Sequence, residues 1–265
     1  EPNFDRIKFD QMMVGYAFAH RFNDVFQIRQ NVRYGTVRNE VYSMRNETDL
    51  VNFPAPGDGV TTLRSANYVF GDTKSLVADT HMQADFATGP LSHKVLFGID
   101  YQKQDVDADY RSGFVVPGYT PGFPINVFAP VYGQPIPGKD EMARFFDTTS
   151  NQHQVGIYLQ DQIKFDRWVV TLTGRYDKAK AETVSRVPAP TVTIDQDDSA
   201  FTGRAGLTYL FDNGVAPYVA YSTSFQPVFG ISLASSGGTP YKPTTGEGWE
   251  AGVKYQPLGY RLLLT

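Results

Sequence analysis

Residues 110–137 hold the densest group of side chains with the chemistry to bind a ligand. Six aromatic residues lie there: Tyr110, Phe114, Tyr119, Phe123, Phe128 and Tyr132. Six prolines stiffen the same segment: Pro117, Pro121, Pro124, Pro130, Pro135 and Pro137. Aromatic rings give large contact areas at a small cost in side-chain entropy, so they suit an amphipathic ligand. The alternative is that the rings only pack the segment against itself.

The sequence carries no recognisable catalytic or metal-binding motif. Its four histidines are far apart, and none forms a pair at metal-ligand spacing. Residues 195–198 (DQDD) begin like a calcium loop, but Ala200 and Gly206 stand where that loop requires glycine and glutamate. We interpret them as a solvated acidic loop. The absence of cysteine excludes thiolate metal sites and cysteine nucleophiles. We therefore predict no catalytic residues, no metal ligands, no cofactor and no enzyme.

Net charge also narrows the range of partners. The formal net charge is −4 and there is no run of basic residues, so nucleic acid is not an expected partner. No stretch of about 18 consecutive apolar residues is present, which excludes a transmembrane helix.

The elements that position these residues alternate apolar with polar side chains over roughly ten residues. In residues 93–105, for example, Val95, Phe97 and Ile99 alternate with Lys94 and Asp100. Successive side chains of a strand point to opposite faces, so such segments form one apolar and one wet surface. We predict nine strands and the start of a tenth: residues 12–22, 25–37, 75–88, 93–105, 152–164, 168–179, 200–211, 215–225, 248–256 and 262–265.

The connections alternate strictly between short and long. Short turns fall at residues 23–24, 89–92, 165–167, 212–214 and 257–260, and long loops at 42–73, 111–151, 182–199 and 226–246. A chain that crosses a bilayer repeatedly as antiparallel strands has its turns on one side and its loops on the other. Lipid tolerates no open sheet edge, so such a sheet must close. We predict an all-β, transmembrane, antiparallel up-and-down β-barrel, of which nine to ten strands form an arc.

Aromatic residues near the short turns predict one interfacial girdle. They are Phe22 with Phe26, Phe165 with Trp168, and Tyr209 and Phe211 with Tyr218. The alternative is that they are ordinary strand aromatics. A soluble β-sandwich would give similar alternation, but with connections of similar length at both ends.

Several ordered stretches carry a family resemblance. They read VGIYLQDQ (155–162), WVVTLTGRYD (168–177), FTGRAGLTYLFDNGVAPY (201–218), YSTSFQP (221–227) and KPTTGEGWEAGVKYQP (242–257). In order and spacing they resemble the TonB-dependent siderophore receptors, and within these most the ferrichrome and other hydroxamate receptors.

The resemblance implies a barrel of about 22 strands whose lumen holds a plug. The plug is an N-terminal domain, preceded by a short segment that contacts the TonB complex. Residues 1–265 match neither part and lack the terminal aromatic residue of the family, so we expect a partial barrel, with the plug and the C-terminal strands outside this chain. The implied location is the bacterial outer membrane, with its lipid as a partner.

The implied ligand is a ferric siderophore of the hydroxamate type, taken up with energy from TonB. Its iron is held by the siderophore itself, so the binder needs aromatic walls and a few polar donors. We expect such a site near the outer mouth of the lumen, formed by Tyr34, Tyr110, Phe114, Tyr119, Phe225 and Gln226. Two alternatives stay open: a passive porin-type channel with charged rings at a constriction, and a soluble all-β binding module.

Overall fold

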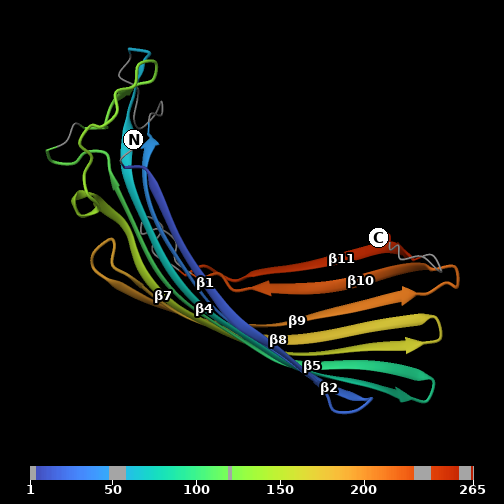
Figure 1. The fold of residues 1–265 in the computed structure, drawn as a ribbon. Helices are drawn as coiled ribbons and strands as arrows, with labels where there is room; N and C mark the ends of the chain where they lie inside the picture. The colour runs from blue at the N-terminus through green and yellow to red at the C-terminus, as the bar shows by residue number, and fades with distance from the viewer. Residues whose placement is uncertain (1–3, 48–57, 119–120, 230–239, 257–263, 265) are drawn as a thin grey trace.

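A computed structural model describes residues 4–47, 58–118, 121–229, 240–256 and 264 (Figure 1). They form a nine-stranded sheet in which each strand pairs with the next along the chain. The strands are β1 (Arg6–Arg21), β2 (Phe26–Asn46), β4 (Arg64–Thr88), β5 (Leu91–Gly113), β7 (Ala143–Phe165), β8 (Trp168–Ser185), β9 (Val192–Tyr209), β10 (Val215–Gln226) and β11 (Thr244–Tyr255). Every pairing is antiparallel, which confirms the predicted up-and-down order.

Smaller elements lie beside this sheet. The strands β3 (Thr61–Thr62) and β6 (Ile125–Asn126) pair only with each other, and η1 (Lys139–Glu141) is a 3-10 turn. No helix in the described ranges is long and apolar enough to cross a membrane. Tyr255 forms an isolated antiparallel bridge with Leu264, while the rest of the predicted tenth strand lies outside the described residues.

At the short turns, the strand ends lie within two residues of their predicted positions. Local turn chemistry explains this agreement. The side-chain oxygen of Asn23 accepts hydrogen bonds from the backbone N–H groups of Val25 and Phe26, at 2.9 and 2.8 Å. Gly89 and Gly214 adopt positive φ angles of 61° and 86°, which suit tight hairpins.

At the first three of the four long connections the strands run well beyond their predicted ends. The prediction ended one strand at residue 105 and began the next at 152, whereas β5 continues to Gly113 and β7 begins at Ala143. Likewise, the acidic segment 195–198, interpreted as a loop, belongs to β9, where a hydrogen bond from Lys180 lowers the pKa of Asp197. In the extensions of β5 and β9 the convex face carries charged and polar residues, so the apolar stripe that marks the strands of the band ends although the backbone ladder continues.

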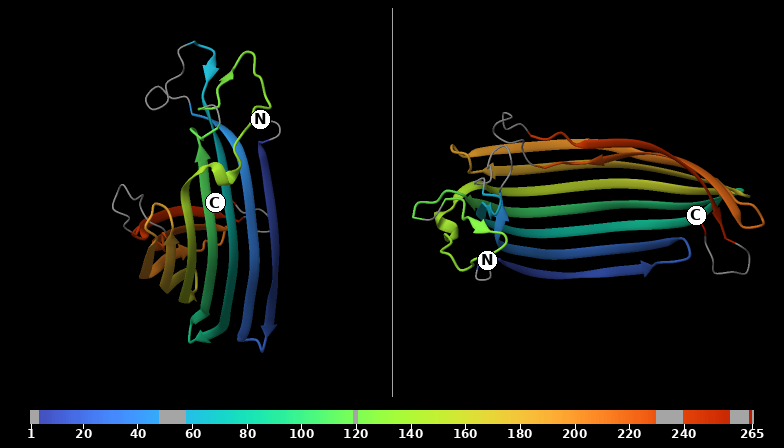
Figure 2. Two further views of the ribbon diagram at one scale, coloured as in Figure 1. Left: turned by 90° about the vertical axis from the view of Figure 1, so that its left-hand side faces the viewer. Right: turned by 90° about the horizontal axis from the view of Figure 1, so that it is seen from above.

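The sheet is strongly twisted and bowed into an open arc (Figures 1 and 2), and its two faces differ. Residues paired directly across strands share a face, so the register places Ile99, Ile157, Tyr176 and Phe201 on one surface. Large apolar side chains on this face are exposed, as for Ile157 at 46%. The other face holds small and polar residues that are buried: Asp100, Asp177, Ala179, Ala181 and Ala220. Bowing crowds the concave side of a sheet, so the polar face is concave and the apolar face convex.

The apolar band on the convex face has the height of a bilayer core. In β2, β8 and β9 it occupies residues 26–34, 168–176 and 201–209, nine residues each, with an aromatic side chain at both ends. A tilted strand needs about 9–11 residues to cross the hydrocarbon region. The convex face therefore has the dimensions of a lipid-facing surface.

The aromatic residues near the turns divide between the two faces. The ring centroids of Trp168 and Tyr209 lie 4.7 Å apart, and Phe211 packs on Tyr209 at the same distance. Tyr218, in contrast, shares the concave face with Glu250 and donates a 2.6 Å hydrogen bond to its carboxylate. The interpretation of Tyr218 as part of the girdle was therefore wrong, because the strand register turns its ring inward.

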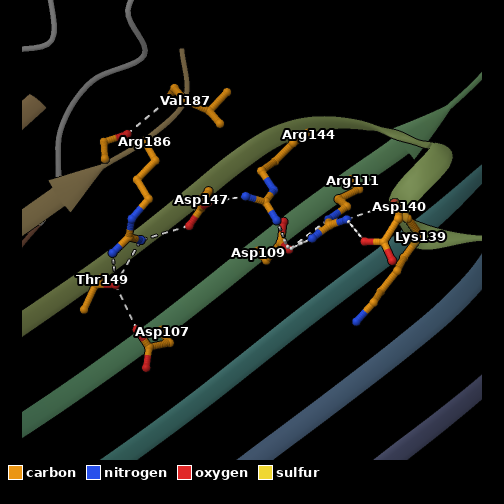
Figure 3. A network of polar contacts seen from close by, with 11 residues as sticks. Asp107, Asp109, Arg111, Lys139, Asp140, Arg144, Asp147, Thr149, Arg186 and Val187 are labelled. Carbon is orange, nitrogen blue, oxygen red and sulfur yellow. Dashed lines mark hydrogen bonds and ion pairs between the residues drawn. The ribbon is translucent and has the colours of Figure 1, made fainter. Parts of the chain in front are cut away.

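Beyond the apolar band, ion pairs connect the extended strands across the convex face (Figure 3). Asp109 accepts from Arg111 Nε at 2.9 Å and from Arg144 Nη2 at 3.3 Å. Arg144 and Arg186 both contact Asp147, at 2.5 and 3.0 Å. The network thus joins β5, β7 and the residue that follows β8.

A small apolar cluster covers the far end of β2 and β4. Tyr42, Ala66 and Tyr68 pack there with Phe4, Phe123 and Met142. Arg64 holds the long connection in place, because its Nε donates to the carbonyl of Phe123 at 3.0 Å. Burial raises the pKa of Tyr68 to about 12, so this phenol stays neutral in the cluster.

Candidate functional site on the concave wall

Arg175 is the centre of a polar cluster midway along the concave face. Its guanidinium contacts Asp100 on β5 through two hydrogen bonds of 2.5 and 3.1 Å. On its own strand it contacts Asp177 through two more, of 2.7 and 2.5 Å. Paired bonds of this kind are the strong form of arginine–carboxylate recognition. Asp100 and Asp177 are only 8% and 3% exposed, so the cluster is a rigid part of the wall.

Two glycines make room for this cluster. A Cβ added to Gly156 would overlap the guanidinium of Arg175, and one added to Gly98 would overlap the ring of Tyr158. Each long side chain therefore lies flat across the neighbouring strand, over a residue that has no side chain. Glycine in a strand weakens it, and close approach of another group is a recognised reason for its presence.

Tyr158 extends the cluster toward β4. Its hydroxyl donates a 2.7 Å hydrogen bond to Asp79, whose other carboxylate oxygen lies 2.9 Å from Nδ1 of His81. Three carboxylates thus face one guanidinium and one imidazole. The cluster has no spare positive charge, so it suits contact with neutral or cationic groups better than capture of an anion.

Tyr110 lies higher on the same face, near the end of β5. Its hydroxyl donates to the side-chain oxygen of Asn67 at 2.9 Å, and Asn67 is 2% exposed. The ring centroid lies 5.9 Å from that of Phe145. Tyr110 is therefore a fixed aromatic residue at the loop-side rim of the wall.

The six predicted site residues do not form one group. Tyr110 and Gln226 share the concave face, but they lie on β5 and β10 with three strands between them. Tyr34 and Phe225 lie on the convex face, since Tyr34 pairs with Leu76 and Phe225 with Thr245. A place on the lumen wall is thus not supported for these two residues. The prediction used strand height without strand parity, and no finding tests the ligand role of these two residues.

The remaining predicted residues belong to the long connection after β5. Phe114 is half-buried, with its ring close to Gly122, and Tyr119 lies outside the described residues. Phe123 is 4% exposed in the small apolar cluster, so packing explains it. Phe128 is 79% exposed. No finding tests the ligand role of this group, which stays a prediction.

The cluster around Arg175 was missed because the sequence shows its members only as polar residues on a wet face. The available signal was glycine: Gly98 and Gly156 stand opposite polar residues of neighbouring strands. Within the described residues, no group of three or more His, Asp or Glu side chains is arranged to hold a metal ion.

Comparisons with known proteins identify the family. The whole chain, residues 1–265, matches the family described as TonB dependent receptor-like, beta-barrel. The ferrichrome outer membrane transporter/phage receptor of Escherichia coli K12 is 36% identical over 276 residues, which cover 97% of this chain and 35% of the relative. The ferrioxamine B receptor of Salmonella typhimurium is 36% identical over 265 residues, covering 98% of this chain and 34% of the relative.

A solved structure agrees with the fold. The ferric-catecholate import receptor of E. coli K12, in its closed form, superposes with a TM-score of 0.78 at 22% identity. The match covers 98% of this chain and 40% of that one. The chain thus spans about a third of the length of the curated relatives it matches. It belongs to the TonB-dependent receptor-like β-barrel family, whose members are receptors and transporters.

Proposed function

We propose that this chain is part of an outer-membrane receptor that imports a ferric siderophore of the hydroxamate type with energy from TonB. The observation that carries the proposal is the match of nearly the whole of this chain, at 36% identity, to about a third of two relatives that are named for ferrichrome and for ferrioxamine B. Both of these ligands are hydroxamate complexes that already hold their iron. The iron complex is therefore cargo, and the wall need not supply metal ligands.

The two faces of the sheet support this role. The convex band matches the hydrocarbon core in height, so it would face lipid. The concave wall would face the lumen, where Asp100 and Asp177 hold Arg175, and Asp79 accepts a hydrogen bond from Tyr158 beside it. A wall of rigid, paired polar groups suits contact with a plug and passage of a hydrated ligand. In this proposal the plug and the segment that contacts TonB belong to parts of the receptor beyond these 265 residues.

Uptake by cells that express the full-length receptor tests the proposal. Radioactive iron bound to ferrichrome or ferrioxamine B should accumulate in cells that have this receptor as their only siderophore receptor, and removal of TonB should abolish accumulation. TonB-independent entry that rises linearly with concentration would instead identify a passive porin. A fully water-soluble protein that needs no detergent would identify a soluble binding module.

A further inference from the structure

Three polar side chains on the turn-side half of the convex face form a chain of hydrogen bonds. Nδ1 of His93 lies 2.8 Å from a carboxylate oxygen of Asp161, and Nε2 of the same ring lies 2.8 Å from Oγ1 of Thr88. The register places all three on the convex face, because Thr88 pairs with Leu91 and Asp161 with Val95. They come from β5, β7 and β4, so no local sequence motif shows them together.

Hydrogen-bond chemistry fixes the direction of this chain. A carboxylate only accepts, so Nδ1 of the neutral His93 ring carries the hydrogen and donates it to Asp161. Nε2 then has a lone pair and accepts from the hydroxyl of Thr88. A hydroxyl bonded to an imidazole that a carboxylate orients is the arrangement that activates the nucleophile of serine hydrolases. Thr88 is thus positioned to lose its proton to His93.

The surroundings hold the imidazole in place and leave the hydroxyl accessible. The ring of Phe86 stacks on His93, with 5.1 Å between the ring centroids and 13° between their planes. The side chains of His93 and Asp161 are only 13% and 26% exposed, whereas Thr88 is exposed. The second oxygen of Asp161, Oδ1, is buried and has no hydrogen-bond partner among the described residues. No other donor shares this carboxylate, so its charge is directed at the imidazolium that forms when His93 takes a proton.

An apolar groove of about 710 Å³ lies beside this chain. Asp161 lines it together with exposed side chains of the convex face: Phe97, Ile157, Leu159, Leu172, Tyr176 and Phe201. Gly174, which pairs with Leu159, contributes no side chain and so deepens the groove. The register assigns the other lining residues to the concave face: Tyr158, Thr173, Arg175 and Arg204. Within this lining, the convex face therefore offers apolar surface and one carboxylate.

The position of Thr88 matches the depth of a lipid ester. Thr88 is the last residue of β4, directly before a turn, so it lies at the turn-side edge of the apolar band. The ester groups of a phospholipid lie at the same boundary, between the hydrocarbon core and the headgroups. An acyl chain that runs from there toward the middle of the band would pass Asp161 and enter the groove. The site thus suits a substrate with an ester at its polar end and a long apolar chain.

We propose that Thr88 and His93 are catalytic residues of a second activity, the hydrolysis of phospholipid acyl esters at the convex face. Asp161 is a positioning residue, because it acts through the imidazole and does not touch the reacting atoms. This activity goes beyond the proposed function and does not depend on siderophore transport. It would also overturn the expectation, drawn from the sequence, that the chain has no catalytic residues.

The reaction divides into two steps with water as the only co-reactant. Oγ1 of Thr88 attacks the ester carbonyl carbon, and its proton passes to Nε2 of His93. The bond to the glycerol oxygen then breaks and this oxygen takes the proton, which leaves acyl-Thr88 and a lysophospholipid. Water next gives a proton to His93 and attacks the acyl carbonyl; Thr88 recovers the proton as the fatty acid leaves. The N–H of Gly89, which forms no hydrogen bond with another described residue, is available to the oxyanion.

Lipid hydrolysis by the purified full-length receptor tests the proposal. The substrate is phosphatidylethanolamine with radioactive acyl chains in detergent micelles, and released fatty acid is counted. Thr88→Ala and His93→Gln should each lower the rate about 10²–10⁴-fold, whereas Thr88→Ser keeps a hydroxyl and should retain activity. Asp161→Asn should lower kcat with little change in KM, because it disturbs the orientation of the imidazole and leaves the groove intact.

A matched control lies on the same strand and face. Thr80→Ala removes a threonine hydroxyl that bonds Gln30 rather than a histidine, so hydrolysis should be unchanged. Heat-dependent gel mobility selects the variants that are folded barrels. A long-chain alkyl fluorophosphonate, which loses fluoride to the attacking oxygen, should modify Thr88 in the wild type and not in His93→Gln, as mass spectrometry of the peptides measures.

Equal release of fatty acid by the wild type and Thr88→Ala, whether high or absent, would refute the proposal. Modification of a residue other than Thr88 by the fluorophosphonate would refute it as well. Iron uptake from ferrichrome separates this activity from the proposed function: cells with the Thr88→Ala receptor should accumulate iron as the wild type does. Failure of uptake in both would leave the hydrolysis result unaffected, because the two assays share no site.

Discussion

The two halves of the long strands have the same backbone and different side-chain chemistry. On the convex face of β5, the turn-side half presents Val95, Phe97 and Ile99. Further along the same face, the loop-side half presents only charged residues and ends in the network of Figure 3: Lys103, Asp105, Asp107, Asp109 and Arg111. One strand therefore crosses from an apolar environment into water without any break in its hydrogen-bonded ladder.

This difference shows that two separate forces hold one sheet together. In the apolar band, lipid offers no competing hydrogen bonds, so every backbone group must pair within the sheet. In the loop-side half, water competes for these groups, and side chains that connect neighbouring strands add stability. The ion pairs of Asp109 and Asp147 join β5, β7 and the end of β8 where no apolar face remains.

The largest expected effect is a difference in labelling by a membrane-impermeant reagent. It tests which half of the strands lies outside the cell. The chain has no cysteine, so single cysteines report without background. A membrane-impermeant maleimide added to intact cells should label Val131→Cys, which is 68% exposed on the loop side, and should not label Asn213→Cys in a turn. Labelling confined to position 213 would reverse the orientation.

A charge placed within the band should have the next largest effect. Ile157→Arg puts a cation on the convex face in mid-band, and should destabilise the barrel by about 2–4 kcal/mol. Asn151→Arg is the matched control, because it lies on the same strand and face but beyond the band. There the new guanidinium meets water and lies opposite Asp105 and Glu182, so stability should change by less than about 0.5 kcal/mol. Urea unfolding of the full-length barrel in lipid measures both, and equal losses would remove the distinction between the halves.

A side chain added on the crowded concave side of the band should cause a smaller loss of stability. Gly156→Ala would force the guanidinium of Arg175 away from Asp100, and overpacking of this kind costs about 1–3 kcal/mol. Gly248→Ala is the control, because a Cβ there meets no atom within 4 Å. The same unfolding assay compares the two variants. A Gly156→Ala barrel as stable as wild type would mean that the cluster is loose rather than rigid.

The sequence alone predicted the strands within the apolar band, but not their extensions toward the long connections. Alternation such as Val95, Phe97 and Ile99 arises because one face meets lipid and the other water, so it marks strands only where that contrast exists. Beyond Tyr101 the convex face of β5 becomes charged, while Val106, Ala108 and Tyr110 lie on the concave face, so the apolar stripe that marked the strand no longer continues. The resemblance to known receptors gave the fold and the family, but could not set where each strand ends.

The candidate site was harder to predict for a geometric reason. Tyr34 and Phe225 were chosen because they lie near the loop-side ends of the predicted strands. Successive residues of a strand face opposite sides of the sheet, however, so a shift of one residue decides whether a side chain faces the lumen. The alternation itself held this information, since Tyr34 shares a face with Val32 and Phe26. The pairing of Arg175 with Asp100, 75 residues away, depends on cross-strand register, which no local pattern fixes.

The smallest effect should come from the ion pairs of the loop-side half. Asp109 contacts both Arg111 and Arg144, and its side chain is 16% exposed, so Asp109→Asn leaves two guanidinium groups with fewer partners. Arg111 keeps Asp140 and Arg144 keeps Asp147, which limits the loss to about 1 kcal/mol. Asp10→Asn is the control: its pair with Lys8 has side chains 59% and 69% exposed and should contribute almost nothing.

Salt dependence separates this loss from a loss of packing. The difference between wild type and Asp109→Asn should shrink as sodium chloride rises from 0.05 to 1 M, concentrations that shorten the Debye length from roughly 14 to about 3 Å. The loss from Ile157→Arg reflects transfer of a charge into lipid, so it should persist at high salt. If both losses responded to salt in the same way, the loop-side half would not differ from the band in what stabilises it. If only the loss from Asp109→Asn shrinks at high salt, ion pairs stabilise the strand extensions. The same charged residues made these extensions hard to predict from the sequence.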